Sequence, residues 1–322
     1  MTRAGMRPVT RTTRAYFAPV ERGSGTPTVF DPSKDAGFLL DAPTAPWIDL
    51  GWIENFRRAS ASPIQEMTSG TAGAVTAQAR SGLGARIDFE FRDWGKLQMA
   101  LAGGGEHMNV LASDPNAGRA GSGGIALPAV ALQPGSTSGE LVLGAGAVDA
   151  FNEDDLVACD VDYAQQTGYV GSGIAAAYVK DPTNVRQDAD YVRRVTFNVA
   201  RVAAKTTTSL LLAQALAGGT PLAGAAVQKV TAFTDREGGA FLQQWSGLFV
   251  SAEESGGRVC FYYPRLSPVA AADHESRVEI DKPAGLLALR AAFVALPIVD
   301  ENDSATVLCY RSYFPAAGAA AY

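Results

Sequence analysis

Few residues in this sequence combine the types and spacing that chemistry requires. His107 and His274 are its two histidines. His274 lies between Asp273 and Glu275, and a histidine held by a carboxylate is the group that activates a serine nucleophile. No serine stands in the strand–turn–helix context that such a nucleophile needs. We therefore interpret both histidines as exposed loop residues; the alternative is a β-sandwich hydrolase or carbohydrate-binding protein that uses Asp273, His274 and Glu275.

The acidic and glycine-rich segments give weak signals for a metal or a nucleotide. Asp149 and the run Glu153-Asp154-Asp155 lack the alternating oxygen ligands and turn glycine of a calcium loop, which favours a solvated acidic turn. Gly144-Ala145-Gly146 follows an apolar run, but Asp149 stands where a dinucleotide fingerprint needs its third glycine. We therefore expect no metal, no cofactor and no catalytic residue, and predict that the protein is not an enzyme.

The cysteines and the overall composition point the same way. Cys159, Cys260 and Cys309 are odd in number and widely spaced, which argues against a disulfide scaffold or a zinc site. Cys260 and Cys309 lie in apolar runs, so we expect buried thiols. The chain has 322 residues, 47% of them hydrophobic. It can therefore build a large core, but it has few residues of the types that catalysis uses. This balance favours a structural or assembly protein.

Charge and hydropathy limit the partners. The net charge of −6 opposes a protein that grips nucleic acid, which needs a basic face for the phosphates. No apolar stretch follows the N-terminal arginines as in a signal peptide, and no apolar run approaches 18 residues. We therefore expect neither a secretory leader nor a membrane-spanning helix.

The clearest strand lies at residues 85–92, where apolar and charged side chains alternate so that one face meets a core and the other meets water. The apolar face has Ile87, Phe89 and Phe91. A short helix is expected over residues 93–102, with Asp93 as its N-cap and Gly103 as its end.

A similar unit follows later: an alternating strand at 194–199, then a predicted helix over 203–217 that ends in a double glycine. The likeness of these two units is explained either by an internal duplication, with halves at about 45–150 and 155–315, or by chance in a chain rich in Ala and Gly.

Most of the remaining chain has the pattern of short strands separated by turns. Residues 103–124 are predicted to be a loop, and Pro264, Pro297 and Pro315 are expected to close strands. The fold class is therefore mostly β with one or two short helices, arranged as a β-sandwich or barrel. The predicted strands are 125–132, 140–148, 155–163, 173–180, 228–234, 246–251, 258–263, 286–296 and 305–314.

Two long segments have no place in this core. Residues 1–37 are rich in Arg, Thr, Pro and Gly, and are either an arm that orders on a neighbouring subunit or a floppy terminus. Residues 57–84 are polar and small, and are either a long loop or an extended β-hairpin.

Taken in order, these features resemble the tail tube (major tail) proteins of long-tailed bacteriophages over roughly residues 40–315. The resemblance rests on the strand Asp49-Leu50-Gly51-Trp52-Ile53-Glu54, the Ser/Thr/Gly-rich segment after it, and the alternating strand that leads into a short helix. The segments 229–239 and 256–264 add to it.

The resemblance implies a β domain at 38–322, behind the arm at 1–37, that forms rings, commonly six-fold, stacked into a hollow tube. If the chain is duplicated, three subunits would build a pseudo-six-fold ring. Strands of each subunit would join an inner barrel between subunits, leaving no open sheet edge. The arm and the 57–84 segment would contact the next ring, through Arg3, Arg7, Arg11, Arg14, Tyr16, Phe17, Arg57 and Arg58.

On the same resemblance, an acidic or neutral lumen would let DNA pass without binding it. Its candidate lining residues are Asp88, Glu90, Thr196 and Asn198, which otherwise belong to an outer solvated face. The expected partners are further copies of the chain and other tail proteins, without a membrane. The expected location is the virion tail, after synthesis in the bacterial host cytoplasm. The alternative within virions is a capsid decoration or tail-terminator protein.

Overall fold

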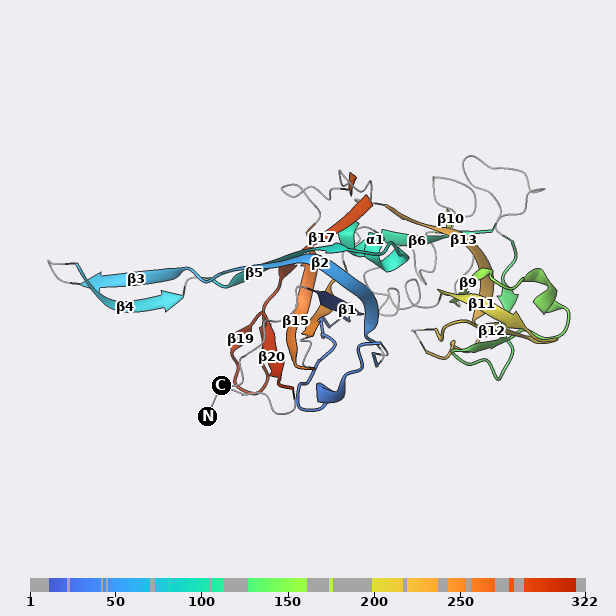
Figure 1. The fold of residues 1–322 in the computed structure, drawn as a ribbon, viewed down its shortest axis with the longest axis horizontal. Helices are drawn as coiled ribbons and strands as arrows, with labels where there is room; N and C mark the ends of the chain where they lie inside the picture. Colours follow the sequence, from blue (N-terminus) through green and yellow to red (C-terminus); the bar gives the residue numbers. More distant parts are fainter. Residues whose placement is uncertain are drawn as a thin grey trace.

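Figure 1 shows the arrangement of the computed structural model: a barrel at the centre, a second sheet on one side, and a two-stranded ribbon that projects from the other side. The structure describes residues 12–21, 24–41, 43–44, 46–69, 73–80, 82–104, 106–112, 127–160, 174–175, 199–216, 219–236, 243–252, 256–269, 278–280 and 287–316.

The centre of the molecule is a closed antiparallel β-barrel of six strands. Around the barrel the order is β17, β5, β2, β1, β14 and β15, and β15 then pairs with β17 to close the ring. This architecture confirms the predicted mostly-β class. The strands are β1 (Thr13–Pro19), β2 (Ile48–Ala61), β5 (Gly84–Phe91), β14 (Trp245–Ala252), β15 (Arg258–Pro268) and β17 (Leu287–Ala295).

Strict alternation fills the barrel with apolar side chains. On β5 the predicted inward residues Ile87, Phe89 and Phe91 are buried, and β17 contributes its own inward set in the same way. Phe17, Phe89, Phe249 and Phe293 meet inside, with ring centroids 5.3 to 6.3 Å apart. Such aromatic pairs add about 0.5–1.5 kcal/mol each beyond the burial of their area.

The N-terminal segment is not the arm that the sequence suggested, at least from Thr13 onward. β1 lies between β2 and β14 inside the barrel sheet. Tyr16 and Phe17 are fully buried, Phe17 in the barrel and Tyr16 on its outer face. Both side chains are therefore enclosed by this chain and are wrong as contacts to a neighbouring ring.

A strap, residues 24–41, covers the outer face of β1, β14 and β15. Its Phe30 and Phe38 pack with Tyr16 and Tyr262, and it includes the short 3-10 helix η1 (Asp35–Gly37). The two tyrosine hydroxyls donate hydrogen bonds to strap carbonyls, Tyr16 to Leu40 at 2.8 Å and Tyr262 to Thr28 at 2.7 Å. The strap therefore gives β1 a second buried face.

β15 pairs with a different strand along each part of its length, because it bends at a bulge. Its first half pairs with β20 (Tyr310–Phe314), and its last residues pair with β17. Between them the register with β14 shifts at Pro264, whose carbonyl accepts a hydrogen bond from the Ser246 hydroxyl at 2.9 Å. Pro264 was predicted to close a strand; instead the strand continues through it, since a bulge tolerates the missing amide donor.

The second sheet is built from the middle of the chain. Its order is β10, β6, β13, β9, β11, β12 and β8, with β7 paired to β13, and it has a core of its own around Val157, Val202, Leu210 and Val227. Its strands are β6 (Glu106–Leu111), β7 (Val130–Ala131), β8 (Glu140–Val142), β9 (Leu156–Asp160), β10 (Ile174–Ala175), β11 (Val199–Lys205), β12 (Ser209–Leu212) and β13 (Ala226–Arg236), with the 3-10 helix η2 (Ala147–Ala150).

Helix α1 (Lys96–Gly103) joins the two sheets, and its Leu97 and Leu101 belong to the barrel core. Lys96 is buried where the sheets meet, and its ammonium donates a hydrogen bond to Asn109 Oδ1 at 2.8 Å. The predicted helix is therefore real, but Gly95 and not Asp93 is its N-cap. No helix in the part of the chain that the structure describes is both long and apolar enough to cross a lipid bilayer.

The predicted helix over 203–217 is wrong, because this segment contains most of the hairpin β11–β12. Thr206 makes the turn: its hydroxyl oxygen accepts the N–H groups of Thr208 and Ser209, at 3.2 and 2.8 Å. The predicted loop over 103–124 is wrong in part, since it contains β6.

The sheets do not follow the proposed halves 45–150 and 155–315, because the barrel takes strands from both ends of the chain and the second sheet takes strands from the middle.

Two short pairs complete the strands: β3 (Ile64–Ser69) with β4 (Ala74–Arg80), and β18 (Ile298–Val299) with β19 (Thr306–Val307). β16 (Val278–Ile280) extends the barrel sheet beyond β17.

We predict that Gly247→Ala lowers the free energy of unfolding by about 1–3 kcal/mol, the usual cost of overpacking a core. A Cβ at this position would lie 2.5 Å from Leu266 Cδ1 and 3.3 Å from Phe249 Cε2. Gly84→Ala is the matched control, because a Cβ there meets nothing within 4 Å. Urea unfolding of both variants tests this, and equal stabilities would contradict the packing described here.

Candidate assembly surface

The ribbon, defined as the described residues from Arg57 to Leu83, continues β2 and β5 out of the barrel and ends in the β3–β4 hairpin (Figure 1). All of its residues whose burial is described are exposed. They include four large apolar side chains, which are Ile64, Met67, Val75 and Leu83. The extended β-hairpin, one of the two predictions for this segment, is therefore the one confirmed.

The two faces of the hairpin differ in chemistry. Residues directly opposite each other in an antiparallel pair share a face. One face contains Glu66 opposite Gln78, joined by a 2.9 Å hydrogen bond, and Ile64 opposite Arg80. The other contains Met67 opposite Ala77 and Gln65 opposite Ala79. We call this second face, defined by Gln65, Met67, Ala77 and Ala79, the apolar face of the ribbon; it has no charged side chain, and Met67 is its one large apolar residue, since Ile64 and Val75 lie on the first face.

A ladder of paired charges covers the outer face of β2, β5 and β17, where two predicted lumen residues lie. Asp88 accepts from Arg86 on its own strand at 3.0 Å. Glu90 accepts from Arg290 of β17 at 2.7 Å. Glu54 of β2 pairs in turn with Arg92. Arg57 of β2 lies opposite Asp88 and shares this face. The three carboxylates are thus fully matched by guanidinium groups, and this face is not acidic.

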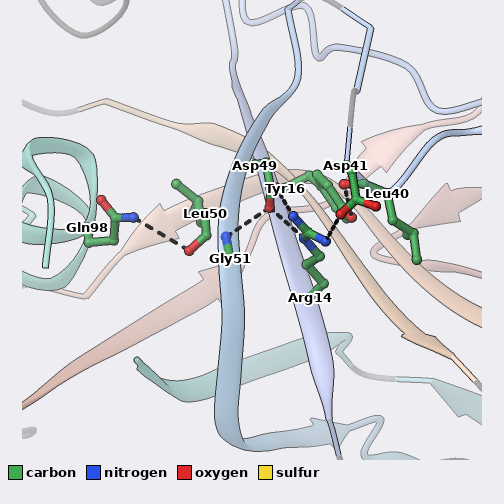
Figure 2. Close-up of polar contacts among 8 residues, drawn as sticks. All are labelled: Arg14, Tyr16, Leu40, Asp41, Asp49, Leu50, Gly51 and Gln98. Atoms are coloured by element: carbon green, nitrogen blue, oxygen red, sulfur yellow. Dashed lines mark hydrogen bonds and ion pairs between the residues drawn. The ribbon is translucent and has the colours of Figure 1, made fainter. Parts of the chain in front are cut away.

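Arg14, predicted to contact the next ring, instead ties three segments of its own chain together (Figure 2). Its Nε donates to Asp49 Oδ1 at 3.0 Å, and its terminal nitrogens pair with Asp49 and with Asp41 of the strap. Asp49 Oδ1 also accepts the backbone N–H of Gly51 at 2.9 Å. These carboxylates raise the pKa of Arg14, which stays charged. Arg14 is therefore an internal anchor, and its predicted contact with a neighbouring ring stays a prediction.

The remaining sequence candidates are scattered. Arg57 and Arg58 lie exposed at the base of the ribbon, so their predicted contacts to a neighbouring ring stay a prediction. His107 is in strand β6 and not in a loop. Outside the described residues lie Arg3, Arg7, Arg11, Thr196, Asn198, Asp273, His274 and Glu275.

The acidic turn at residues 152–155 and the three cysteines have contacts that explain them without a metal or a reactive thiol. Asp155 pairs with Lys229 at 2.6 Å and accepts the N–H of Asn152, so it belongs to a structural turn. No group of three metal-ligating side chains is found in the described part of the chain. Cys159 and Cys260 are buried, and Cys309 is half-buried. Burial raises the pKa of the Cys260 thiol to about 11, which keeps it protonated and unreactive at neutral pH.

Sequence reasoning missed the apolar face of the ribbon. A signal for it was present, because residues 74–80 alternate small apolar with polar side chains over part of their length. Alanine is too weakly hydrophobic for this alternation to identify a face without the register. No protein-family model matches the chain, and no curated protein matches it significantly.

We predict that Arg14→Ala lowers the free energy of unfolding by about 2 kcal/mol, because it leaves the half-buried Asp49 carboxylate without its charged donor. Arg14→Lys should lose part of this, since an ammonium cannot bind a carboxylate through two parallel bonds. Arg57→Ala, at an exposed position of the adjoining strand, is the control and should change stability by less than about 0.5 kcal/mol. Equal losses for Arg14→Ala and Arg57→Ala in chemical denaturation would contradict the anchor.

Proposed function

We propose that this protein is a structural virion subunit that assembles with copies of itself into stacked rings, forming the tail tube of a long-tailed bacteriophage. The single observation that carries the proposal is the ribbon. The ribbon leaves a well-packed barrel, exposes every one of its residues whose burial is described, and includes large apolar side chains on both faces, Met67 on the apolar face and Val75 on the other.

The physical argument is that a two-stranded ribbon has little stability of its own. An isolated hairpin in water is marginal, and a third strand or a packing partner is needed to hold it. The strands of this ribbon are nevertheless continuous with β2 and β5 of the barrel. A second copy that covers the apolar face would supply the missing layer, and repetition of this contact would produce an open stack of subunits.

The charge ladder supports passage of DNA through such a tube. A surface that holds DNA needs an excess of basic groups to neutralise phosphates. The outer face of β2, β5 and β17 instead pairs Asp88, Glu90 and Glu54 with arginines. If this face lines the lumen, its mutually paired charges leave few groups to bind phosphates, and the lining expected from the resemblance is acidic or neutral.

The first test is negative-stain electron microscopy of the purified protein over a concentration series. We expect hollow tubes with a regular axial repeat above a threshold concentration. Isolated rings would favour the alternative of a tail terminator or another virion β-protein. Single subunits at all concentrations would overturn self-assembly by this chain alone.

The second test places the same charge on opposite faces of the ribbon. Met67 lies on the apolar face and Thr68, the next residue, lies on the other face opposite Val75. We expect Met67→Glu to raise the threshold concentration for assembly by at least about tenfold, because an unpaired carboxylate would be buried in the contact. Thr68→Glu should change this threshold by less than about threefold.

Both side chains are exposed, so neither substitution should unfold the subunit, and circular dichroism provides the check. Assembly that is blocked by Thr68→Glu and unaffected by Met67→Glu would show that the other face makes the contact. Assembly unaffected by either would remove the ribbon from the interface.

A further inference from the structure

β2 contains two bulges just before the ribbon begins. Between Arg14 and Tyr16 of β1, the paired strand β2 has one extra residue, at Gly51, whose φ is +81°. Between Glu90 and Asp88 of β5, β2 has a second extra residue, at Asn55, whose φ is +53°. Each bulge thus has one residue in the left-handed region, a region that glycine and asparagine enter more readily than other residues.

The bulges change which residues of β2 face the barrel. In a regular strand, inward residues are two apart. Here Leu50, Ile53 and Phe56 pack with the barrel core at spacings of three, because each bulge adds a residue between them. The ring of Phe56 lies 4.8 Å from Phe249 and 5.8 Å from Phe261. From Arg57 onward the strand is exposed, so Phe56 is the last β2 side chain that is partly buried before the ribbon.

The second bulge is fixed by a side chain. The Asn55 amide donates to Glu90 Oε2 at 2.9 Å, and Glu90 is held in turn by Arg290 of β17 at 2.7 Å. Asn55 therefore links the bend of β2 to two neighbouring strands. A bulge both bends its strand and increases the local twist, so its geometry sets the direction of everything beyond it.

The ribbon turns a small change at this bend into a large one at its end. Asn55 and Ser69, the last residue of β3, are fourteen residues apart, which is about 46 Å of strand. A change of about 10° at the bulge would therefore move the end of the ribbon by about 8 Å, which is more than two residues of strand.

From this geometry we infer that Asn55 is a positioning residue: its left-handed backbone and its bond to Glu90 set the direction of the ribbon, and so which surface of a second copy the ribbon reaches. The part that concerns a second copy rests on the proposed function. The part that concerns direction is a property of the single subunit, and it can be measured without assembly.

The test measures the distance between two spin labels in dilute, full-length subunits by double electron–electron resonance. The labels are attached at Ala79→Cys in the ribbon and Arg311→Cys on β20, both exposed positions, in a Cys309→Ser background. Cys159 and Cys260 are buried and stay in place. Three substitutions are compared with this parent: Asn55→Gly, Asn55→Val and Ser60→Val, the last a control at an exposed β2 position outside both bulges.

We expect Asn55→Gly to keep the mean distance within about 3 Å with a broader distribution, because glycine keeps the backbone conformation and loses the side-chain bond. Asn55→Val should shift the mean by at least about 5 Å, since a β-branched residue disfavours positive φ. Ser60→Val should change nothing. If Asn55→Val does not fold, Asn55→Ala provides the same comparison with a smaller shift.

An unchanged distance in a folded Asn55→Val or Asn55→Ala would overturn the inference, whether or not the protein forms tubes. If the parent assembles and the distance shifts, the variant should form no tubes or tubes of altered helical twist. If the parent never assembles, the proposed function fails while the distance still decides the role of Asn55.

Discussion

The barrel is closed by a strand from the beginning of the chain, and the rest of the molecule depends on that strand. β1 pairs with β2 on one side and with β14, more than 230 residues later, on the other. Without it the N-terminal strands β2 and β5 would be joined to the C-terminal strands only through β17. Arg14 and Tyr16 fix this strand to Asp49 and to the strap, and Phe17 fills the barrel. The ribbon has a rigid base because the barrel is closed.

The structure thus combines a barrel whose side chains and strand edges are covered within the subunit with a ribbon whose side chains are left exposed. Inside the barrel, aromatic packing and complete pairing of neighbouring strands leave no edge between the six strands. The ribbon has backbone pairing between its two strands, but no side-chain burial among residues whose burial is described. This contrast is the physical basis for proposing a partner, and the position of the ribbon at the end of two barrel strands makes its direction a property of the whole subunit.

The sequence predicted those elements whose two faces differ. β5 was identified because Ile87, Phe89 and Phe91 alternate with charged residues that form the outer ladder. β1 was missed because both of its faces are buried, by the core and by the strap, so Ala15, Tyr16 and Phe17 show no alternation. Bulges hid the core residues of β2 by spacing them three apart. The β11–β12 hairpin was taken for a helix because consecutive leucines fit either period. At the candidate surface, the hairpin itself could be predicted, but its apolar face depends on a register that one sequence does not reveal.

The central claim is that the ribbon is exposed in the single subunit and covered by another copy on assembly, and backbone hydrogen exchange measures this directly. The account predicts that amides of the hairpin Ile64–Arg80 exchange rapidly in dilute subunits, while those of β1 and β14 are strongly protected. In assembled material the hairpin amides should slow by at least about a hundredfold, as expected for a region that becomes part of a packed sheet. Hairpin amides that stay fast in assembled material, or that are already protected in dilute subunits, would contradict the account.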